Sequence, residues 1–157
     1  MKTSLKDLQV AMEHLQIQLS DILQQSMYRE YEDLSGIVCD VNNPDEQLLI
    51  NEYKGILYRL SDVEYSLSYL KRPIEYEDTL VTRPDGRYGT RNGRTYYTSG
   101  SGIEFLYNDD VLGEDGYFKT VPVWRISSVE HNGSDYFIVG YPDVDLDGLK
   151  VRVRKRQ

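Results

Sequence analysis

Sulfur, imidazole and indole side chains are scarce in this sequence, which has one cysteine, two histidines and one tryptophan among 157 residues. The single cysteine, Cys39, has no partner for a disulfide within the chain, which is typical of a reducing compartment. No hydrophobic run approaches the roughly 18 residues of a transmembrane helix. The carboxylate of Asp7 also interrupts the N-terminus before the apolar core of a signal peptide develops. We therefore expect a cytoplasmic protein with no membrane partner.

Catalytic chemistry has few residues to draw on. Enzymes bring titratable side chains together, and here His14 and His131 are far apart in sequence. His131 shares a turn with Ser134 and Asp135, but residues so close in sequence do not reach the geometry of a catalytic triad easily. The sequence thus predicts a protein that is not an enzyme and that needs no cofactor.

One segment matches the opening of a calcium-binding loop. Asp143, Asp145 and Asp147 alternate before Gly148, as in the first half of an EF-hand loop. The twelfth position of that loop is Arg154, where a bidentate glutamate is needed. The three aspartates are the only candidate ligands, and no metal site is predicted from them.

Heptad patterns dominate the first 74 residues. Apolar residues alternate in steps of three and four along two segments, with the average period of 3.5 that marks a coiled-coil seam. Gly36 should end the first helix, Asn43-Pro44 should begin the second, and Pro73 should end it. We predict an antiparallel two-helix coiled-coil hairpin over residues 1–74. Its seams are Leu5, Leu8, Met12, Leu15, Leu19 and Ile22 on one helix, and Leu49, Tyr53, Ile56, Leu60, Val63, Leu67 and Leu70 on the other.

A further set of large side chains on the second helix lies outside its seam. Because two helices bury little surface by themselves, these side chains should contact something else. Three partners are open: the C-terminal half of the chain, a second copy of the hairpin in a four-helix arrangement, or a different protein. The residues are Leu48, Leu57, Tyr58, Tyr65 and Tyr69.

After Pro73 the pattern changes to short β-branched and aromatic runs separated by turn residues. Residues 75–157 are therefore predicted to form a small β-barrel module, which makes the whole chain an α+β protein. Strands are expected near 79–83, 87–91, 94–98, 103–107, 117–129, 136–141 and 149–154. A two-residue type I′ turn at Asn92-Gly93 would pair Tyr88 with Tyr97.

That turn places Arg87, Arg91, Arg94 and Tyr96 on the opposite face of the hairpin. Two arginines directly across from each other repel, so an anion is expected beside them. One candidate is a carboxylate of this acidic chain. The other is a phosphate backbone with Tyr96 as a stacking platform, and in that case Arg152 and Arg154 would extend the basic surface.

Negative charge is concentrated in the helical half. The net charge of the chain is −8, and residues 1–75 hold 7 Lys+Arg against 13 Asp+Glu, compared with 11 against 13 in residues 76–157. An elongated acidic surface can mimic nucleic acid and occupy a basic groove of another protein. The outward carboxylates expected to form that surface are Asp21, Glu30, Glu52 and Glu64.

Residues from about Asp85 to Arg154 carry several short structural motifs. These are Gly86-Arg87-Tyr88, Trp124-Arg125-Ile126, the segment 136–140 (YFIVG) and the segment 146–152 (LDGLKVR). In these motifs the segment resembles a family of small bacterial domains of unknown function, found mainly in Firmicutes and often encoded on mobile elements. The resemblance implies an SH3-like barrel and carries no catalytic residues.

Together these features predict a non-catalytic protein-interaction protein, in its sharper form an acidic accessory or inhibitor protein of a bacterial mobile element. Its partner would be another protein or a second copy, joined as a homodimer through the helices. The alternative is nucleic-acid binding through the basic face of the β module.

Overall fold

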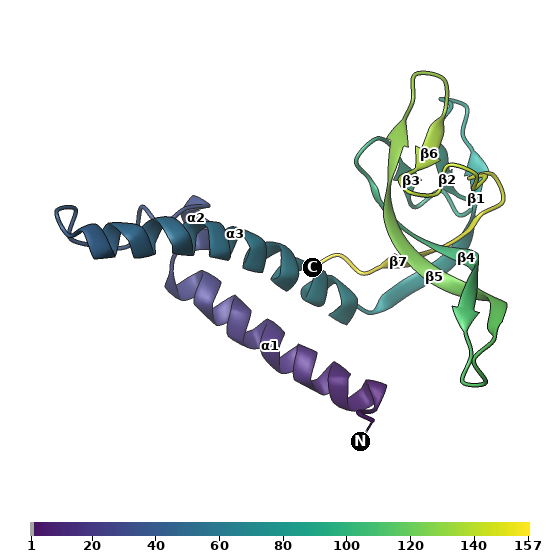
Figure 1. Cartoon of the computed structure of the whole chain (residues 1–157). Coiled ribbons are helices and arrows are strands. Elements are labelled where there is room, and N and C mark those ends of the chain that lie inside the picture. The colour runs from purple at the N-terminus through teal and green to yellow at the C-terminus, as the bar shows by residue number, and fades with distance from the viewer. Residues whose placement is uncertain (1) are drawn as a thin grey trace. The chain divides into compact units, whose positions relative to one another are not determined.

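The computed structural model describes residues 2–157 and contains two compact units, of which the first ends at Arg72 and the second begins at Pro73 (Figure 1). The first unit is helical and the second is a β-sheet, so the predicted α+β class is confirmed. None of the helices within residues 2–157 is both long enough and apolar enough to cross a membrane.

The helical unit consists of α1 (Leu5–Gln25), the single turn α2 (Tyr28–Tyr31) and α3 (Pro44–Lys71). The Asn43 side chain caps α3 by accepting hydrogen bonds from the amides of Asp45 and Glu46, and Pro44 occupies the first turn. This start agrees with the prediction. Glu46 accepts a hydrogen bond from the Asp40 amide, so it orders the preceding loop as well.

The expected continuation of the first helix to Gly36 is wrong, since α1 ends at Gln25. Met27 and Glu32 have left-handed backbone angles, with φ of 57° and 53°, and they bracket α2. These bends let the chain fold back over α3, where apolar side chains form a small core. The core consists of Leu23, Tyr28, Leu34 and Leu57, flanked by Ile37, Ile50 and Leu60.

The predicted coiled coil is not confirmed. Figure 1 shows α1 diverging from α3 toward the N-terminus, so the two helices do not stay in contact along the whole of α1. Of the predicted seam on α1, Leu19 is buried, whereas Leu5, Leu8 and Met12 are exposed. The two seams therefore do not close on each other along their length.

The second unit is one antiparallel sheet in the order β3-β2-β1-β7-β4-β5-β6. The sheet curls into a half-barrel (Figure 1), which is the form that the predicted small barrel takes. Backbone hydrogen bonds of Val129 with Gly100 and Ser101 tie the segment after β3 to β5. The strands are β1 (Ile74–Thr82), β2 (Tyr88–Thr90), β3 (Tyr96–Tyr97), β4 (Gly102–Leu112), β5 (Phe118–His131), β6 (Tyr136–Ile138) and β7 (Lys150–Arg154).

Alternate side chains of the curled sheet point inward and form its core. The fully buried members include Leu80, Phe105, Val129, Ile138 and Val151. Phe105 lies opposite Val151 across the β4–β7 pair, and its ring packs edge-on against Tyr141 at 5.1 Å between centroids. Such alternation is what a strand with one covered face requires.

Pro122 lies within β5, opposite Asn108 of β4. Beyond β4, β5 pairs with β6 only at residues 129–131. The side of β5 at Pro122 that does not face β4 is thus a sheet edge, where the missing N–H costs no ladder hydrogen bond.

Candidate interaction surfaces

A polar network joins α1 to α3. The Gln16 amide donates to a Glu64 carboxylate oxygen at 2.8 Å, and the Arg29 guanidinium lies 2.8 Å from the other oxygen. Lys71 Nζ donates to the Gln16 side-chain oxygen at 2.9 Å. Glu64 is only 9% exposed, and a buried carboxylate is tolerated because it is paired and hydrogen-bonded in this way. Polar groups therefore occupy the contact between the helices where a coiled coil would place its seam.

The residues in contact repeat every seventh position: Gln9, Gln16 and Leu23 on α1, and Leu57, Glu64 and Lys71 on α3. Each of these residues follows directly after a large apolar residue. In two antiparallel helices, residues one position before the contact residues point to the same side of the pair.

We call these preceding residues, together with Leu49 seven positions before Ile56, the open stripes: Leu8, Leu15 and Ile22 on α1, with Leu49, Ile56, Val63 and Leu70 on α3. Their exposed fractions lie between 37% and 55%. An apolar side chain left in water costs free energy, and the open stripes are a contiguous set of such side chains rather than scattered ones. The stripes thus mark a candidate interaction surface of the helical unit.

Two hollows lie between α1 and α3. One, of about 480 Å³, is lined by the apolar side chains of Leu8, Met12, Leu67 and Leu70 and by polar side chains that include Gln9 and Lys71. The other, of about 390 Å³, lies nearer the connecting loop and has Ile22, Tyr53 and Ile56 among its lining residues. Residues of both open stripes border each hollow, which agrees with their placement on one side of the pair.

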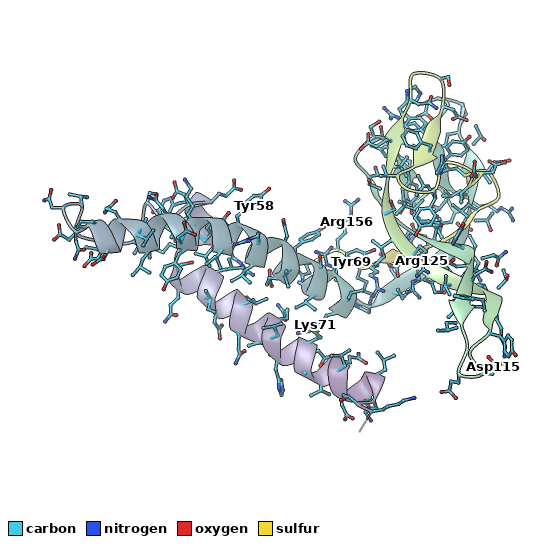
Figure 2. All side chains as sticks on the ribbon, in the orientation of Figure 1. Tyr58, Tyr69, Lys71, Asp115, Arg125 and Arg156 are labelled. Carbon is cyan, nitrogen blue, oxygen red and sulfur yellow. The ribbon has the colours of Figure 1, made fainter. Side chains whose placement is uncertain are left out.

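The residues predicted to need a partner fall into three groups. Leu48, Tyr58 and Tyr65 are exposed, and Figure 2 shows Tyr58 on the side of α3 away from α1. Tyr69 is half-buried, with the Arg72 guanidinium 5.6 Å from its ring centroid. Leu57 was expected to be uncovered, but it is buried in the core with Leu23, and this expectation is wrong.

Of the four carboxylates predicted to form the acidic surface, three are exposed and one is buried. Asp21, Glu30 and Glu52 are exposed on the helical unit. Glu64 was expected to face outward, and the structure corrects this, because its carboxylate lies in the polar network between the helices. The heptad pattern misplaced Glu64 since it assigned the helix contact to the apolar stripe one residue earlier.

On the sheet, Tyr96 lies close to two guanidinium groups. The central carbons of Arg83 and Arg87 are 5.2 and 5.6 Å from the centroid of its ring, which is exposed. A hydrogen bond with the Tyr136 side chain is the main cause that raises the pKa of Arg87. Asp85 lies 3.8 Å from both guanidiniums, so the cluster of two cations and one carboxylate keeps net positive charge. We call Arg83, Arg87 and Tyr96 the arginine–tyrosine cluster.

The other predicted basic residues are separate from this cluster. Arg94 forms an ion pair with Glu75 and lies over the Tyr76 ring at 4.5 Å. Arg91 lies close enough to Asp78 to help lower the pKa of that carboxyl, although hydrogen bonds from the amides of Asn92 and Thr79 are the larger causes. A carboxylate of the same chain is thus the neighbour of Arg94, which is one of the two alternatives that the sequence left open.

Arg152 and Arg154 both bind the buried carboxylate of Glu104. Arg152 Nε donates at 2.6 Å and Arg154 Nε at 2.8 Å, each to a different carboxylate oxygen. The Arg152 guanidinium also stacks 4.5 Å from the Trp124 ring. These two arginines are therefore engaged in holding β7 to β4 and do not extend the arginine–tyrosine cluster.

The alternating aspartates do not assemble. Within residues 2–157, no group of three or more His, Cys, Asp or Glu side chains is placed to hold a metal ion, and this includes Asp143, Asp145 and Asp147. The Asp145 carboxylate instead accepts a hydrogen bond from the Asp147 amide at 2.9 Å, as in an ordinary turn.

Two residues of these sites were not predicted from the sequence. Arg83 joins Arg87 at Tyr96 because the Pro84-Asp85-Gly86 turn closes there, with the Arg83 amide donating to the Arg87 carbonyl at 2.7 Å. The other is Gln16, whose seven-residue spacing from Gln9 and Leu23 signals a contact face beside the apolar one. Neither signal stands out, since an arginine before a turn and a glutamine on a helix are common.

Comparison with known protein families gives a match over part of the chain. Residues 79–153 match the model of a family described as a domain of unknown function (DUF5348), which confirms the resemblance to a domain family of unknown function. No curated protein and no solved structure matches the chain.

Proposed function

We propose that this protein is a non-catalytic protein-interaction protein that acts through its helical unit. The observation that carries the proposal is the placement of side chains on the helix pair: polar residues lie at the contact between the helices, and a row of large apolar residues faces solvent. Gln16, Glu64 and Lys71 join α1 to α3 beside the small apolar core of the unit, whereas the apolar open stripes face outward. A helix face with this composition is normally covered by another helix or protein surface.

The test compares what the full chain captures when its open stripes are intact and when they are charged. Leu15→Glu with Val63→Glu places a carboxylate at the middle of each stripe. The chain would be immobilised and offered both a bacterial lysate and a differently tagged copy of itself. We expect the double variant to lose bound proteins, while Ile17→Glu, an exposed apolar position outside the stripe, retains them. Identical captured sets for all three proteins would refute the proposal.

The sharper form of this proposal concerns the acidic outer faces. Asp21, Glu30 and Glu52 are exposed on the helical unit, and together with the excess of carboxylates they support a nucleic-acid mimic that occupies a basic groove. An accessory or inhibitor protein of a bacterial mobile element would act in this way on a nucleic-acid-binding protein of its host.

A mimic competes with what it mimics. We expect proteins captured through the acidic faces to be released by salt and by added double-stranded DNA. The triple variant Asp21→Lys, Glu30→Lys, Glu52→Lys should lose them, and a control with Glu114→Lys and Asp115→Lys in the β4–β5 turn should not. Capture that resists salt, DNA and the triple variant would exclude mimicry.

A second candidate function is binding of single-stranded nucleic acid by the β unit. The arginine–tyrosine cluster favours it, because an exposed aromatic ring beside two cations suits a base and its phosphates.

A mobility-shift assay with the full chain and a single-stranded DNA oligonucleotide tests this candidate. We expect binding at low salt that falls as salt rises, is weakened by Arg87→Ala and Tyr96→Ala, and is unaffected by Arg94→Ala, whose guanidinium is paired with Glu75. No shift at low salt, or equal losses in all three variants, would remove the candidate.

A further inference from the structure

The open stripes form an apolar face of three layers. The two hollows place Leu8 with Leu70 and Ile22 with Ile56. Because both stripes advance by seven residues in opposite directions, Leu15 and Val63 come level between those two pairs. Each layer thus contributes one large apolar side chain from each helix.

The area of this face is large enough for a stable interface. Counting the open stripes together with Leu5, Met12 and Tyr53, all of them more than a third exposed, the helical unit exposes on the order of 1,000 Å² of these residues. Each partner of a standard protein interface buries about 800 Å². The whole face is therefore more than a single loop or a short peptide would cover.

We propose that a second copy of this chain covers the open stripes, so that two helical units form a four-helix bundle. The proposal rests on the function proposed above and names the partner of the same surface. A heptad-spaced face packs best on helices that carry the same spacing, at a shallow crossing angle. The helical unit is itself such a pair of helices.

The face is self-complementary under two-fold symmetry. If the axis runs across the helices at the level of Leu15 and Val63, each of these residues meets its own copy, and Leu8 meets Ile22 of the second copy. If the axis runs along the helices, α1 lies over α3 of the second copy, and Leu15 then meets Val63. Apolar residues meet in all three layers either way, as an isologous interface requires.

Charge does not oppose this association at the edges of the face. The residues three positions after each stripe residue line its outer edge. On α1 they are Ala11, Gln18 and Gln25, which are uncharged. On α3 they are Glu52, Arg59 and Ser66, which together have no net charge. The carboxylates of the unit that remain exposed, such as Asp21, stay outside the bundle and are displayed twice by the dimer.

The first measurement is the mass of the full chain in solution by light scattering. We expect twice the chain mass of 18.3 kDa, and we expect that mass to persist in high salt, since apolar burial is strengthened rather than screened by salt. A mass of 18.3 kDa at all concentrations up to those used for structural work would overturn the proposal.

Matched variants locate the interface. Leu15→Glu with Val63→Glu should halve the mass, while Ile17→Glu should leave it doubled. Circular dichroism checks that helix content is retained. If the double variant loses helix content, disulfide cross-linking in a Cys39→Ser background provides the second readout. Leu15→Cys alone should cross-link two copies if the axis runs across the helices, and Leu15→Cys with Val63→Cys should cross-link them if the axis runs along the helices. Absence of a cross-linked dimer in both cysteine variants, or a doubled mass in a folded Leu15→Glu, Val63→Glu variant, would overturn the proposal.

The result separates the two proposals. A monomeric chain whose capture of lysate proteins still depends on Leu15 and Val63 would refute the dimer and leave the interaction function standing. A monomeric chain with no such dependence would refute both.

Discussion

At the scale of single residues, carboxylates decide how the arginines of the sheet are used. Glu104 is fully buried and accepts hydrogen bonds from both Arg152 and Arg154, and Trp124 stacks on one of these guanidiniums. This arrangement joins β4 to β7 at the centre of the sheet order. Removing the carboxylate would leave two cations in a site built for an ion pair.

We predict that Glu104→Ala lowers the free energy of unfolding by about 3–5 kcal/mol, the usual cost of breaking a buried ion pair from one side. The matched control is Glu77→Ala in β1, whose exposed carboxylate lies 3.3 Å from Lys150 of β7. That change should cost less than about 1 kcal/mol. Chemical denaturation measures both, and equal losses would show that burial of Glu104 does not matter.

The stability of the sheet should depend on pH through the Asp109 carboxyl. Its hydrogen bond with Arg125 is the main cause that holds the pKa of the Asp109 carboxyl below its ordinary value of 3.8. A carboxyl whose pKa is lower in the folded protein contributes stability above the unfolded value, and this contribution disappears as the pH falls through the folded value.

We therefore expect Asp109→Asn to be less stable than the wild type at pH 7, with a difference that shrinks below about pH 3.8. Urea denaturation of both proteins at neutral and acidic pH measures this difference. A difference that stays constant or grows on acidification would contradict the assignment.

At the scale of elements, the β2–β3 hairpin has the predicted strand register but a different turn. The predicted pairing of Tyr88 with Tyr97 is confirmed, but the predicted type I′ turn is wrong. Such a turn needs positive φ at both central residues, and here only Gly93, at 75°, has it. The Gly93 amide donates to the Thr90 carbonyl at 2.8 Å, so the loop spans four residues and Asp78 binds the Asn92 amide.

Gly93 is the residue on which this longer turn depends. We predict that Gly93→Ala destabilises the protein by about 1–2 kcal/mol, because an L-residue is strained at this backbone angle. The control is Gly102→Ala, where φ is not positive and an added methyl group meets no atom within 4 Å. That change should be neutral or slightly stabilising. Similar thermal unfolding of both variants would contradict the prediction.

At the scale of the whole molecule, the helical unit and the half-barrel have separate cores, the first built around Leu23 and Leu57 and the second around Phe105 and Val151. The helical core is the smaller one, and most of the apolar surface of α1 and α3 lies outside it. The stability of that unit should thus depend on whatever covers its open stripes.

If a second copy covers them, mass action links stability to protein concentration. We predict that the melting temperature of α1 and α3, followed by circular dichroism at the helical wavelength, rises with protein concentration in the wild type. It should be independent of concentration in the double variant Leu15→Glu, Val63→Glu. A melting temperature that does not change with concentration in either protein would refute a second copy as the cover of the stripes.

Features that depend on local spacing follow from the sequence alone. Period and turn residues located α3 and the seven strands, although β1 begins earlier, at Ile74, and β4 continues further, to Leu112, than expected. The Asn43-Pro44 cap marked the start of α3, and cross-strand spacing set the register at Tyr88. These predictions succeed because backbone hydrogen bonding and side-chain alternation act over a few residues.

Which faces meet depends on tertiary contacts. Gln16, Glu64 and Lys71 take the helix contact because a hydrogen-bonded polar set fits there, and this leaves every second residue of the predicted seams, the open stripes, exposed. In the sheet, Glu104, Glu75 and Asp78 assign each arginine its place across strands distant in sequence. Pairings of this kind depend on long-range geometry, which the spacing of residues along one chain does not contain.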